Sequence, residues 1–347
     1  MRSTLRRTAP PRAAVHPAAR RPRAARGAVA LVPVLALLAA CGGTSDASET
    51  AAGGDLQAAA QAAGLEVDTS PDQDRVRTEE NAAAIALLPP ELADQDTFTV
   101  AVSAYVAPLA FLADDDATPI GNETDIAQLV ADALGKDLDL QVKAWADWPL
   151  AVQSGDVDAV ISNVTVTEER KETFDFSSYR NDELGWLVKA GSDITAIDEA
   201  SDIAGLTVAV GSGTNQEKIL LAWDEENQAA GLDPVQVEYF ENDGDTILAL
   251  QSGRIDASFG PNATAAYKAK VSPQDFTVVG TLNGGWPDTA QIAVTTLKDS
   301  GWADAVTAAL QGAFDDGSYQ EVLERWGLEA EAIDAPVTNP PGLPKTS

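Results

Sequence analysis

The stretch from Ser162 to Arg170 carries the residue types that are best suited to hold an anion. It follows an apolar run, Val157 to Ile161, whose composition is typical of a buried strand. Thr167 can cap a helix that begins here, and the arginine then lies about one turn into that helix. Free backbone N–H groups, hydroxyl groups and a guanidinium fork can together grip both oxygens of a carboxylate. We therefore predict a carboxylate-binding site, with a capped helix and a solvated arginine as the alternative.

The elements that must position this site alternate between apolar strands and amphipathic helices. Strands are predicted at 98–102, 138–142 and 157–161, and helices at 125–134 and 148–154. The second helix is followed by Gly155, a residue type that commonly ends helices. Apolar strands that alternate with amphipathic helices are typical of a mostly parallel sheet that is covered on both faces.

Two short motifs occur twice, in the same order. The first, which reads Thr-Val-Ala-Val, begins at Thr99 and again 108 residues later at Thr207. The second begins with Gln-Ser-Gly at Gln153 and again 98 residues later at Gln251. This ordered repeat predicts two lobes of one α/β design. Each lobe would offer the end of a strand to a shared cleft, with residues 163–165 from the first lobe and 259–262 from the second.

The N-terminal segment has the pattern of an export signal. Its first forty residues hold eight arginines and no acidic residue, and the apolar run from Gly27 to Ala40 is too short to span a bilayer. The run ends in small residues before Cys41, which resembles the lipobox of bacterial lipoproteins. We predict that Cys41 is lipidated and becomes the mature N-terminus. The alternative is an ordinary secretory signal with an incidental cysteine.

Few residues of catalytic or metal-binding type are present. The chain has one cysteine, one histidine and one methionine, which are Cys41, His16 and Met1. After cleavage at the cysteine no histidine remains, and the only thiol is acylated. This excludes disulfides, cysteine nucleophiles, Ser-His-Asp triads and zinc sites built on histidine or cysteine. We expect no cofactor and no metal.

The charge of the mature chain argues against polyanionic partners. It would keep 15 basic residues against 54 acidic ones, a net charge of about −39. Such a surface repels nucleic acids and anionic lipid headgroups. Two acidic runs, Asp114–Asp116 and Asp243–Asp245, lack the ligand spacing of a calcium loop. We interpret them as a solvated turn and a helix N-cap.

From about Phe98 to Ile333 the chain resembles family 3 extracellular solute-binding proteins, the receptors of polar amino acid ABC importers. The segment from Ser162 to Arg170 is similar to the family's Ser-Ser-x-Ser-Ile-Thr-x-x-Arg motif. The resemblance implies a type II periplasmic-binding-protein-like fold, in which two α/β lobes are joined by a two-strand hinge. It also implies that Thr165 and Arg170 hold the α-carboxylate of a ligand. The other expected contacts on this strand end are Asn163 and Val164.

The resemblance suggests a wall for the ligand in the first lobe. Residues Tyr105 to Leu109 match the family's Tyr-Ala-Pro-Phe loop imperfectly, with the tyrosine one place early. Trp148 falls where the family often has an apolar or aromatic wall residue, so it could replace the lost stacking surface. The alternative is a tryptophan of the core. The start of the predicted helix near Gly121 matches a family motif that is mainly structural.

In the second lobe, residues Gly211 to Gln216 match the family's Gly-Thr-Thr turn. Thr214 and Asn215 could donate hydrogen bonds at a helix N-terminus. No third glycine follows at dinucleotide spacing, so NAD is rejected. Pro261 stands where many family members have an aspartate that pairs with the ligand's α-ammonium. Asn262 is one residue late and uncharged, so either another acid compensates or the ligand is not a simple α-amino acid.

The resemblance also divides the chain. The expected parts are an export signal at 1–40, a tether with a short helical extension at 41–92, a first lobe at 93–186 and 287–333, a second lobe at 187–286, and a disordered tail at 334–347. The crossing strands are predicted near 184–189 and 288–294, and the closing helices of the first lobe at 302–314 and 319–326.

The resulting functional prediction is a lipid-anchored, monomeric receptor on the outer face of the cell membrane. It would close on a small carboxylate-bearing solute and deliver it to an ABC permease and its ATPase, without catalysis. Two alternatives remain open, an enzyme similar to cyclohexadienyl dehydratases on the same fold and a sensor lipoprotein.

Overall fold

The computed structural model describes residues 67–104, 106–240 and 242–345. The predicted export signal with Cys41, and the predicted wall residue Tyr105, lie outside these residues.

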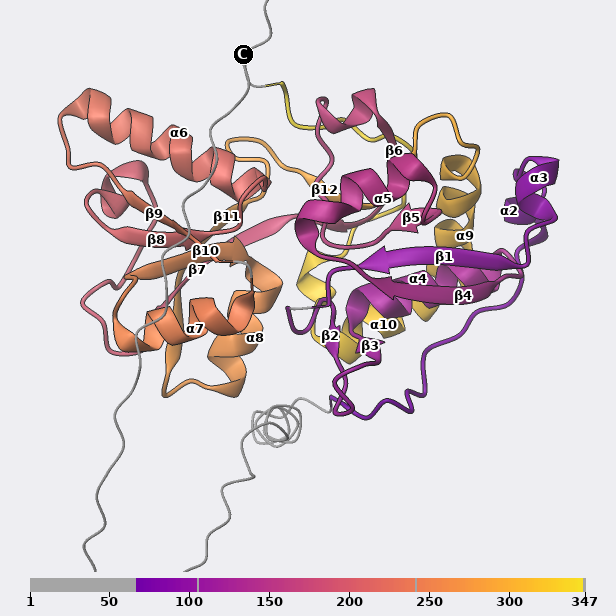
Figure 1. Cartoon of the computed structure of the whole chain (residues 1–347), viewed down its shortest axis with the longest axis horizontal. Helices are drawn as coiled ribbons and strands as arrows, with labels where there is room; N and C mark the ends of the chain where they lie inside the picture. Colours follow the sequence, from indigo (N-terminus) through magenta and orange to yellow (C-terminus); the bar gives the residue numbers. More distant parts are fainter. Residues whose placement is uncertain (1–66, 105, 241, 346–347) are drawn as a thin grey trace, which may run out of the picture. The chain divides into compact units, whose positions relative to one another are not determined.

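Two five-stranded sheets form the centres of two α/β lobes (Figure 1). The first sheet has the order β4-β1-β5-β12-β6, made of β1 Thr97–Val102, β4 Asp137–Val142, β5 Ala159–Val160, β6 Phe174–Asn181 and β12 Gln291–Leu297. In it, β1 pairs in parallel with β4 and β5, whereas β12 is antiparallel to β5 and β6. A separate two-stranded ribbon joins β2 Phe111–Leu112 to β3 Pro119–Ile120.

The second sheet has the order β11-β7-β10-β8-β9, made of β7 Glu183–Lys189, β8 Thr207–Val210, β9 Gln236–Tyr239, β10 Ala257–Pro261 and β11 Phe276–Asn283. Here β8 is parallel to β9 and β10, and β7 is antiparallel to β10 and β11. The predicted architecture of two α/β lobes is confirmed. In each sheet four strands run in one direction, as expected for a mostly parallel sheet, and the inner strand that arrives from the other lobe, β12 or β7, runs opposite to them.

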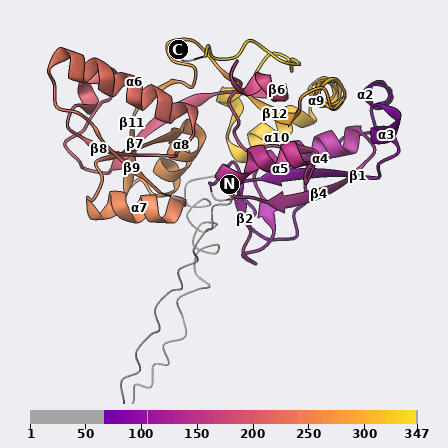
Figure 2. The ribbon, with the colours of Figure 1, turned by 45° about the horizontal axis from the view of Figure 1, so that its top comes forward.

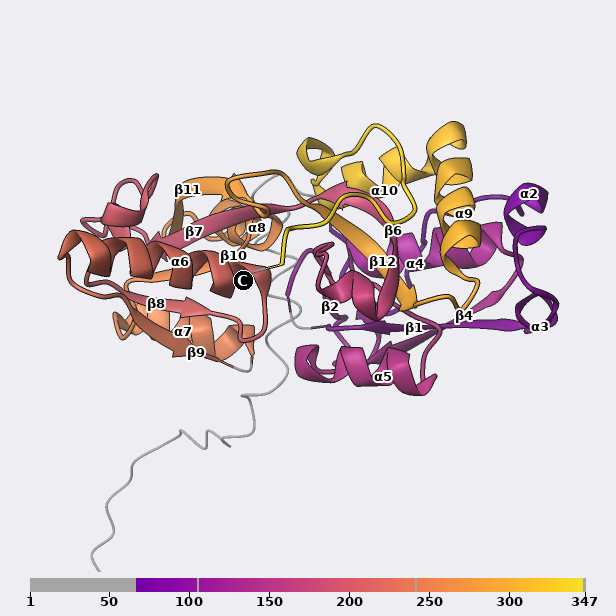
Figure 3. The same cartoon turned by 90° about the horizontal axis from the view of Figure 1, so that it is seen from above.

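Helices cover both faces of each sheet. In the first lobe these are α4 Asn122–Ala133, α5 Trp148–Ser154, α9 Ala303–Asp316 and α10 Ser318–Trp326. Figure 3 shows α5 on one side of the sheet and α9 and α10 on the other. In the second lobe, α6 Asn215–Ala230 lies on the face opposite α7 Asp243–Ser252 (Figure 2), and α8 is Asn262–Val271. Each face buries its own apolar cluster. Within the described residues, no helix has the length and apolarity needed to cross a membrane.

The internal repeat has a structural counterpart in each lobe. The two copies of the Gln-Ser-Gly motif end α5 and α7, and their glycines are Gly155 and Gly253. Both adopt the left-handed conformation, with φ values of 76° and 72°, which glycine reaches without steric cost. The same helix end therefore precedes a central strand in both lobes.

The chain passes between the sheets twice. The first passage is at Asp182, between β6 and β7, and the second is at residues 284–290, between β11 and β12. Residues 183–186 pair with β10 and β11 and so belong to the second lobe, not to the first lobe as predicted. The boundary is displaced because one continuous extended segment serves both sheets, and its apolar pattern does not change at the lobe boundary.

An ordered extension precedes β1. Arg75 forms an ion pair with Asp125 at 2.7 Å, and Arg77 forms one with Asp132 at 2.6 Å, so both anchor the extension to α4. The short helices α2 Ala82–Ile85 and α3 Pro90–Ala93 follow, and α2 packs against α9. The expected helix against the first lobe is present. Residues 67–92 therefore lie along that lobe.

The predicted disordered tail is ordered from 334 to 345. Its backbone forms hydrogen bonds with β6 and with residues 166–168. The expectation was wrong because β6 is an edge strand, whose free N–H and C=O groups can pair with an extended segment whatever its proline content.

Candidate functional site

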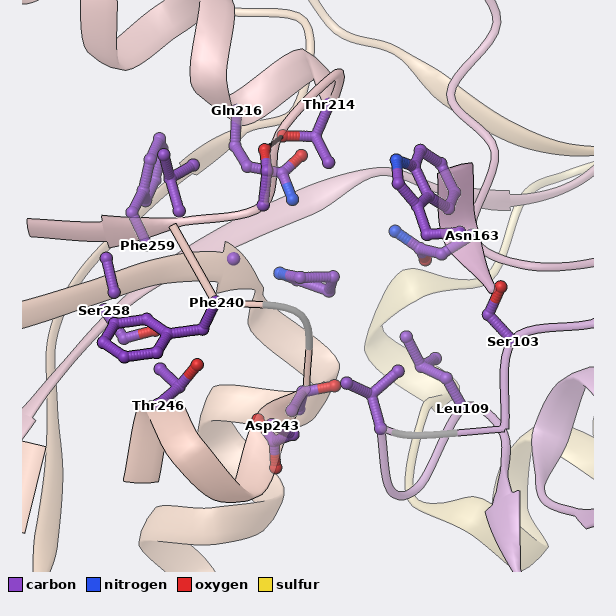
Figure 4. A pocket seen from close by; sticks show the side chains of 18 of the residues that line it. Ser103, Leu109, Asn163, Thr214, Gln216, Phe240, Asp243, Thr246, Ser258 and Phe259 are labelled. Atoms are coloured by element: carbon purple, nitrogen blue, oxygen red, sulfur yellow. Dashed lines mark hydrogen bonds between the residues drawn. The ribbon is translucent and has the colours of Figure 1, made fainter. Parts of the chain in front are cut away.

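A pocket of about 460 Å³ is lined by residues of both lobes. The first lobe contributes Ser103, Val106, Leu109, Glu123, Ala144, Trp145, Ala146, Ser162, Asn163, Thr165 and Arg170. Figure 4 shows Ser103, Leu109 and Asn163 on one side of the pocket and Thr214, Gln216, Phe240, Asp243 and Thr246 on the other. The predicted strand ends of both lobes therefore meet at one pocket.

Arg170 reaches both lobes from a short 3₁₀ turn, Arg170–Glu172, which replaces the predicted α-helix. The Thr167 hydroxyl oxygen accepts a 3.0 Å hydrogen bond from the Arg170 N–H, as predicted for a capping residue. The guanidinium donates to the carbonyl of Thr165 at 2.8 Å and to the carbonyl of Gly213, in the second lobe, at 3.4 Å. A guanidinium has five N–H donors, so others remain for a carboxylate in the pocket.

Two tryptophans flank this guanidinium. The Arg170 Cζ lies 5.8 Å from the ring centroids of both Trp145 and Trp148. Trp145 lines the pocket, whereas Trp148 is only 3% exposed and packs against Phe174 in the core of the first lobe. Trp145 therefore lines the pocket, and the predicted wall residue Trp148 is the core tryptophan of the alternative prediction.

A signal for this assignment is present in the sequence. Trp148, Ala151 and Val152 have the i, i+3, i+4 spacing of a helix face that packs on a sheet, and all three are buried. Trp145 precedes this helix in the turn η1 Trp145–Asp147 and is only partly buried against the same apolar cluster.

The Thr165 hydroxyl is engaged in a way that the family resemblance does not imply. It donates a 2.7 Å hydrogen bond to the carboxylate of Asp182, at the first passage between the lobes. Asp182 is 2% exposed, and burial raises the pKa of its carboxyl, an effect that the hydrogen bond from Thr165 and the nearby Arg180 and Arg170 oppose. Thr165 still lines the pocket and supplies the carbonyl that orients Arg170.

A buried carboxylate, Glu123, lies behind Asn163. Both Glu123 oxygens accept from the backbone N–H of Asn163 at 2.9 Å, and one also accepts from the Tyr179 hydroxyl at 2.9 Å. Arg180, also buried, lies 3.6 Å from Glu123 and forms an ion pair with Glu331. Burial raises the pKa of Glu123, against the opposing charge of Arg180. Glu123 thus lines the pocket as well as supporting the strand end.

The sequence predicts a mainly structural role for the region of Glu123. Its side-chain partners Tyr179 and Arg180 come from β6, and Arg180 in turn pairs with Glu331 of the C-terminal region, so no local pattern links these segments. Only the folded chain brings them together.

The N-terminus of α6 faces the pocket. Thr214 caps this helix by accepting from the Glu217 N–H at 3.2 Å, and its hydroxyl donates to the Gly211 carbonyl at 2.6 Å. Asn215 lines the pocket, but its side-chain amide donates to the carbonyl of Gly284, in the second passage between the lobes. A sixteen-residue helix directs free N–H groups and the positive end of its dipole at this point, which favours an anion.

Two predicted contacts lie away from the pocket. Val164 is fully buried in the core of the first lobe. Asn262 begins α8, and its amide donates to Glu183 at 3.3 Å, whereas its neighbour Pro261 lines the pocket.

Acidic side chains that could pair with an ammonium group come from positions other than 261 and 262. Of the described residues that line the pocket, Glu123 and Asp243 are the acidic ones. Asp243 forms an ion pair with Lys268, which also lines the pocket. The described part of the chain contains no group of three or more histidine, cysteine, aspartate or glutamate side chains that could hold a metal ion.

Most of the chain is similar to known proteins. The model of the bacterial extracellular solute-binding proteins, family 3, matches residues 98–329. The arginine-binding protein ArgT of Corynebacterium glutamicum is 29% identical over 255 residues, which cover 73% of this chain and 82% of that protein.

Two solved structures are similar over most of the described chain. An ancestral arginine-binding protein bound to arginine is 28% identical, with a TM-score of 0.59, and the match covers 67% of this chain and 98% of that one. An ancestral amino acid-binding protein, described as a precursor of cyclohexadienyl dehydratase, is 25% identical with a TM-score of 0.58, and the match covers 68% of this chain and 97% of that one.

Proposed function

Because the chain belongs to the bacterial extracellular solute-binding proteins of family 3, we propose that it is the solute receptor of an ABC importer. Its solute is a small carboxylate-bearing molecule, an amino acid or a derivative of one, held in the pocket between the two sheets. The observation that carries this proposal is the position of Arg170, which lines the pocket and donates to a carbonyl of each lobe. Binding proteins of this family act outside the cytoplasm, and a lipid on Cys41 would keep this one, as a monomer, at the membrane.

The polar groups around Arg170 suggest how the carboxylate is held. One oxygen meets the guanidinium, and the other meets the N-terminus of α6 at Thr214 and Asn215. Both groups contact the solute together only when the lobes are closed, so the solute favours the closed state by the free energy of the contacts that this state adds. The permease would then recognise the closed form and receive the solute.

The charges of the pocket also bear on the class of solute. Pro261 cannot pair with an α-ammonium, so a carboxylate of the wall must take that role if the solute is an α-amino acid. Glu123 already accepts from Asn163 and Tyr179, whereas Asp243 has Lys268 as its partner and is partly exposed. Asp243 is therefore the acid that can more easily turn to a cationic group.

A thermal-shift screen of the whole chain tests the proposal, with amino acids, opines, polyamines and small organic acids as probes. A ligand at a hundred times its Kd should add about 2.7 kcal/mol to the free energy of unfolding. We expect an amino acid, with L-arginine tested first, to stabilise the wild type but not Arg170→Ala. Arg254→Ala is the matched control, because Arg254 pairs with Glu238 on the exposed surface of the second lobe.

The pattern of stabilisation separates the possible outcomes. If only carboxylates without an ammonium group stabilise the protein, the receptor proposal stands and the solute is not an amino acid. If no probe stabilises the protein, the solute-receptor proposal fails for this panel and a sensor lipoprotein becomes the better proposal.

One observation favours a second candidate, a dehydratase similar to the cyclohexadienyl dehydratases. Glu123 lines the pocket, and burial raises the pKa of its carboxyl, as a general acid requires. The likeness to an ancestral precursor of such an enzyme points the same way. Incubation with prephenate and with arogenate tests this candidate, and product that is absent with Glu123→Gln would support it.

A further inference from the structure

The C-terminal segment 334–345, which we call the C-terminal strap (yellow in Figure 3), first pairs with the free edge of β6. The Ser178 N–H donates to the Val337 carbonyl at 3.1 Å, and the Asn339 N–H donates to the Phe176 carbonyl at 2.7 Å. The Asn339 side chain accepts from the Phe176 N–H at 3.0 Å. The strap therefore extends the first sheet by a short strand-like segment.

Beyond Asn339 the C-terminal strap turns and pairs with the segment that leads to Arg170. Asn339 has a φ of 50°, a left-handed conformation that asparagine tolerates better than most residues. The Leu343 N–H donates to the Val166 carbonyl at 3.1 Å, and the Glu168 N–H donates to the Leu343 carbonyl at 2.8 Å. The paired segment lies between two of the pocket-lining residues.

The same segment is held on its other side by the first sheet. The Val166 N–H donates to the Gln291 carbonyl at 2.9 Å, and Thr165 forms an antiparallel bridge with Ile292. Residues 165–168 thus lie between β12 and the C-terminal strap, while Thr165 and Arg170, at either end, line the pocket. A segment fixed on both sides has little freedom to move its side chains away from the pocket.

The strap is fitted closely enough for a small side chain to disturb it. A Cβ added at Gly342 would lie 2.8 Å from the backbone carbon of Thr167 and 2.9 Å from the Glu168 nitrogen. A Cβ added at Gly285, in the second passage between the lobes, would lie 2.7 Å from the Cδ2 of Leu343. The strap is therefore in contact with the Arg170 segment and with the passage at the same place.

We infer that the C-terminal strap is a positioning element for solute binding. It presses residues 166–168 against β12, so that the Arg170 guanidinium is preset for a carboxylate, and Leu343 joins this segment to the second passage. The consequence for affinity rests on the proposed function. The effect on the mobility of the Arg170 segment does not.

Hydrogen exchange of the whole chain, measured without solute, tests the positioning directly. The variants are Gly342→Val, which blocks the close approach, and a chain that ends at Asp334. Exchange of residues 166–172 should become about tenfold faster in both, as expected when the two backbone hydrogen bonds with Leu343 are lost, while α4 keeps its protection. Val337→Ala is the control, because its side chain is exposed and its hydrogen bonds are made by the backbone.

Solute affinity gives a second readout, with L-arginine as the first probe. Both strap variants should weaken binding about tenfold or more in the wild-type background, and much less in an Arg170→Lys background, because the strap acts through that side chain. Equal losses in the two backgrounds would overturn the inference. So would unchanged exchange at 166–172, or an increase spread evenly over the first lobe. If wild type binds no probe, the proposed function fails, while the exchange result still decides whether the strap positions the segment.

Discussion

The Thr165 hydroxyl donates a 2.7 Å hydrogen bond to the carboxylate of Asp182. Thr165 lines the pocket, and Asp182 is the residue at which the chain first passes from one sheet to the other. One hydrogen bond therefore joins the solute site to the passage. The Thr165 carbonyl also accepts from the Arg170 guanidinium, so a single residue lies between Asp182 and the proposed carboxylate anchor.

The first prediction concerns Asp182→Asn and pH. Burial raises the pKa of Asp182 above its ordinary 3.8, so the folded state keeps a proton over a pH range in which the unfolded state has lost it. This contribution to stability is fully present at low pH and is lost as pH rises from about the ordinary value through the raised pKa. Asp182→Asn has no carboxyl at this position to titrate. The free energy of unfolding of the wild type should therefore fall relative to that of the variant as pH rises.

Urea unfolding of both proteins at several pH values between 4 and 8 measures this effect. The loss corresponds to about 1.4 kcal/mol for each pH unit by which the pKa is raised. A difference in unfolding free energy that does not change with pH would contradict the prediction.

The second prediction separates the two tryptophans beside Arg170. Trp145→Leu should weaken solute binding several-fold, because the pocket loses an aromatic wall worth about 0.5–2 kcal/mol, and should leave stability nearly unchanged. Trp148→Leu should instead lower the free energy of unfolding by about 2–4 kcal/mol, because it opens a cavity beside Phe174. Titration calorimetry and urea unfolding of the two variants provide the comparison. The opposite pattern would make Trp148 the pocket wall after all.

The third prediction concerns the geometry of the carboxylate anchor. Arg170→Lys keeps the charge but loses the planar fork, so it cannot donate to both lobes and to a solute at once. We expect affinity to fall by about ten- to a hundredfold, the equivalent of 1.4–2.8 kcal/mol. Arg254→Lys, on the exposed surface, should bind as the wild type does. Full affinity with lysine would mean that charge alone, and not the fork, holds the solute.

The fourth prediction uses the proline at the start of α8. Pro261 caps this helix without a side-chain hydrogen bond, so Pro261→Asp should stabilise the protein by about 0.5–1 kcal/mol as an N-cap. The new carboxylate also lines the pocket, so α-amino acids should gain affinity over the corresponding α-hydroxy acids. Thermal unfolding and paired titrations with L-lactate and L-alanine, or a matched pair for the true solute, check both effects. A gain in stability without a change in this preference would show that the ammonium group lies elsewhere.

Much of the fold could be predicted from the sequence because it is encoded in local patterns. The periodic helices, the apolar strands and the two glycine-ended repeats each lie within about twenty residues, and the structure has them close to the predicted bounds. The proposed carboxylate site could be predicted for the same reason, since Thr165, Thr167 and Arg170 lie within one short segment. The strand end, the capping residue and the arginine lie close together in the sequence, so their proximity does not depend on the tertiary fold.

Tertiary structure alone decided the features that join distant segments. The pairing of Thr165 with Asp182, the cluster of Glu123 with Tyr179 and Arg180, and the docking of the C-terminal strap all depend on groups that are far apart in sequence and meet only in the folded chain. A proline-rich tail has the same composition whether it is free or paired, because what orders it is the unpaired edge of β6. The spacing of Trp148 with Ala151 and Val152 indicates a buried helix face, but only the position of α5 on the sheet places Trp145 at the pocket.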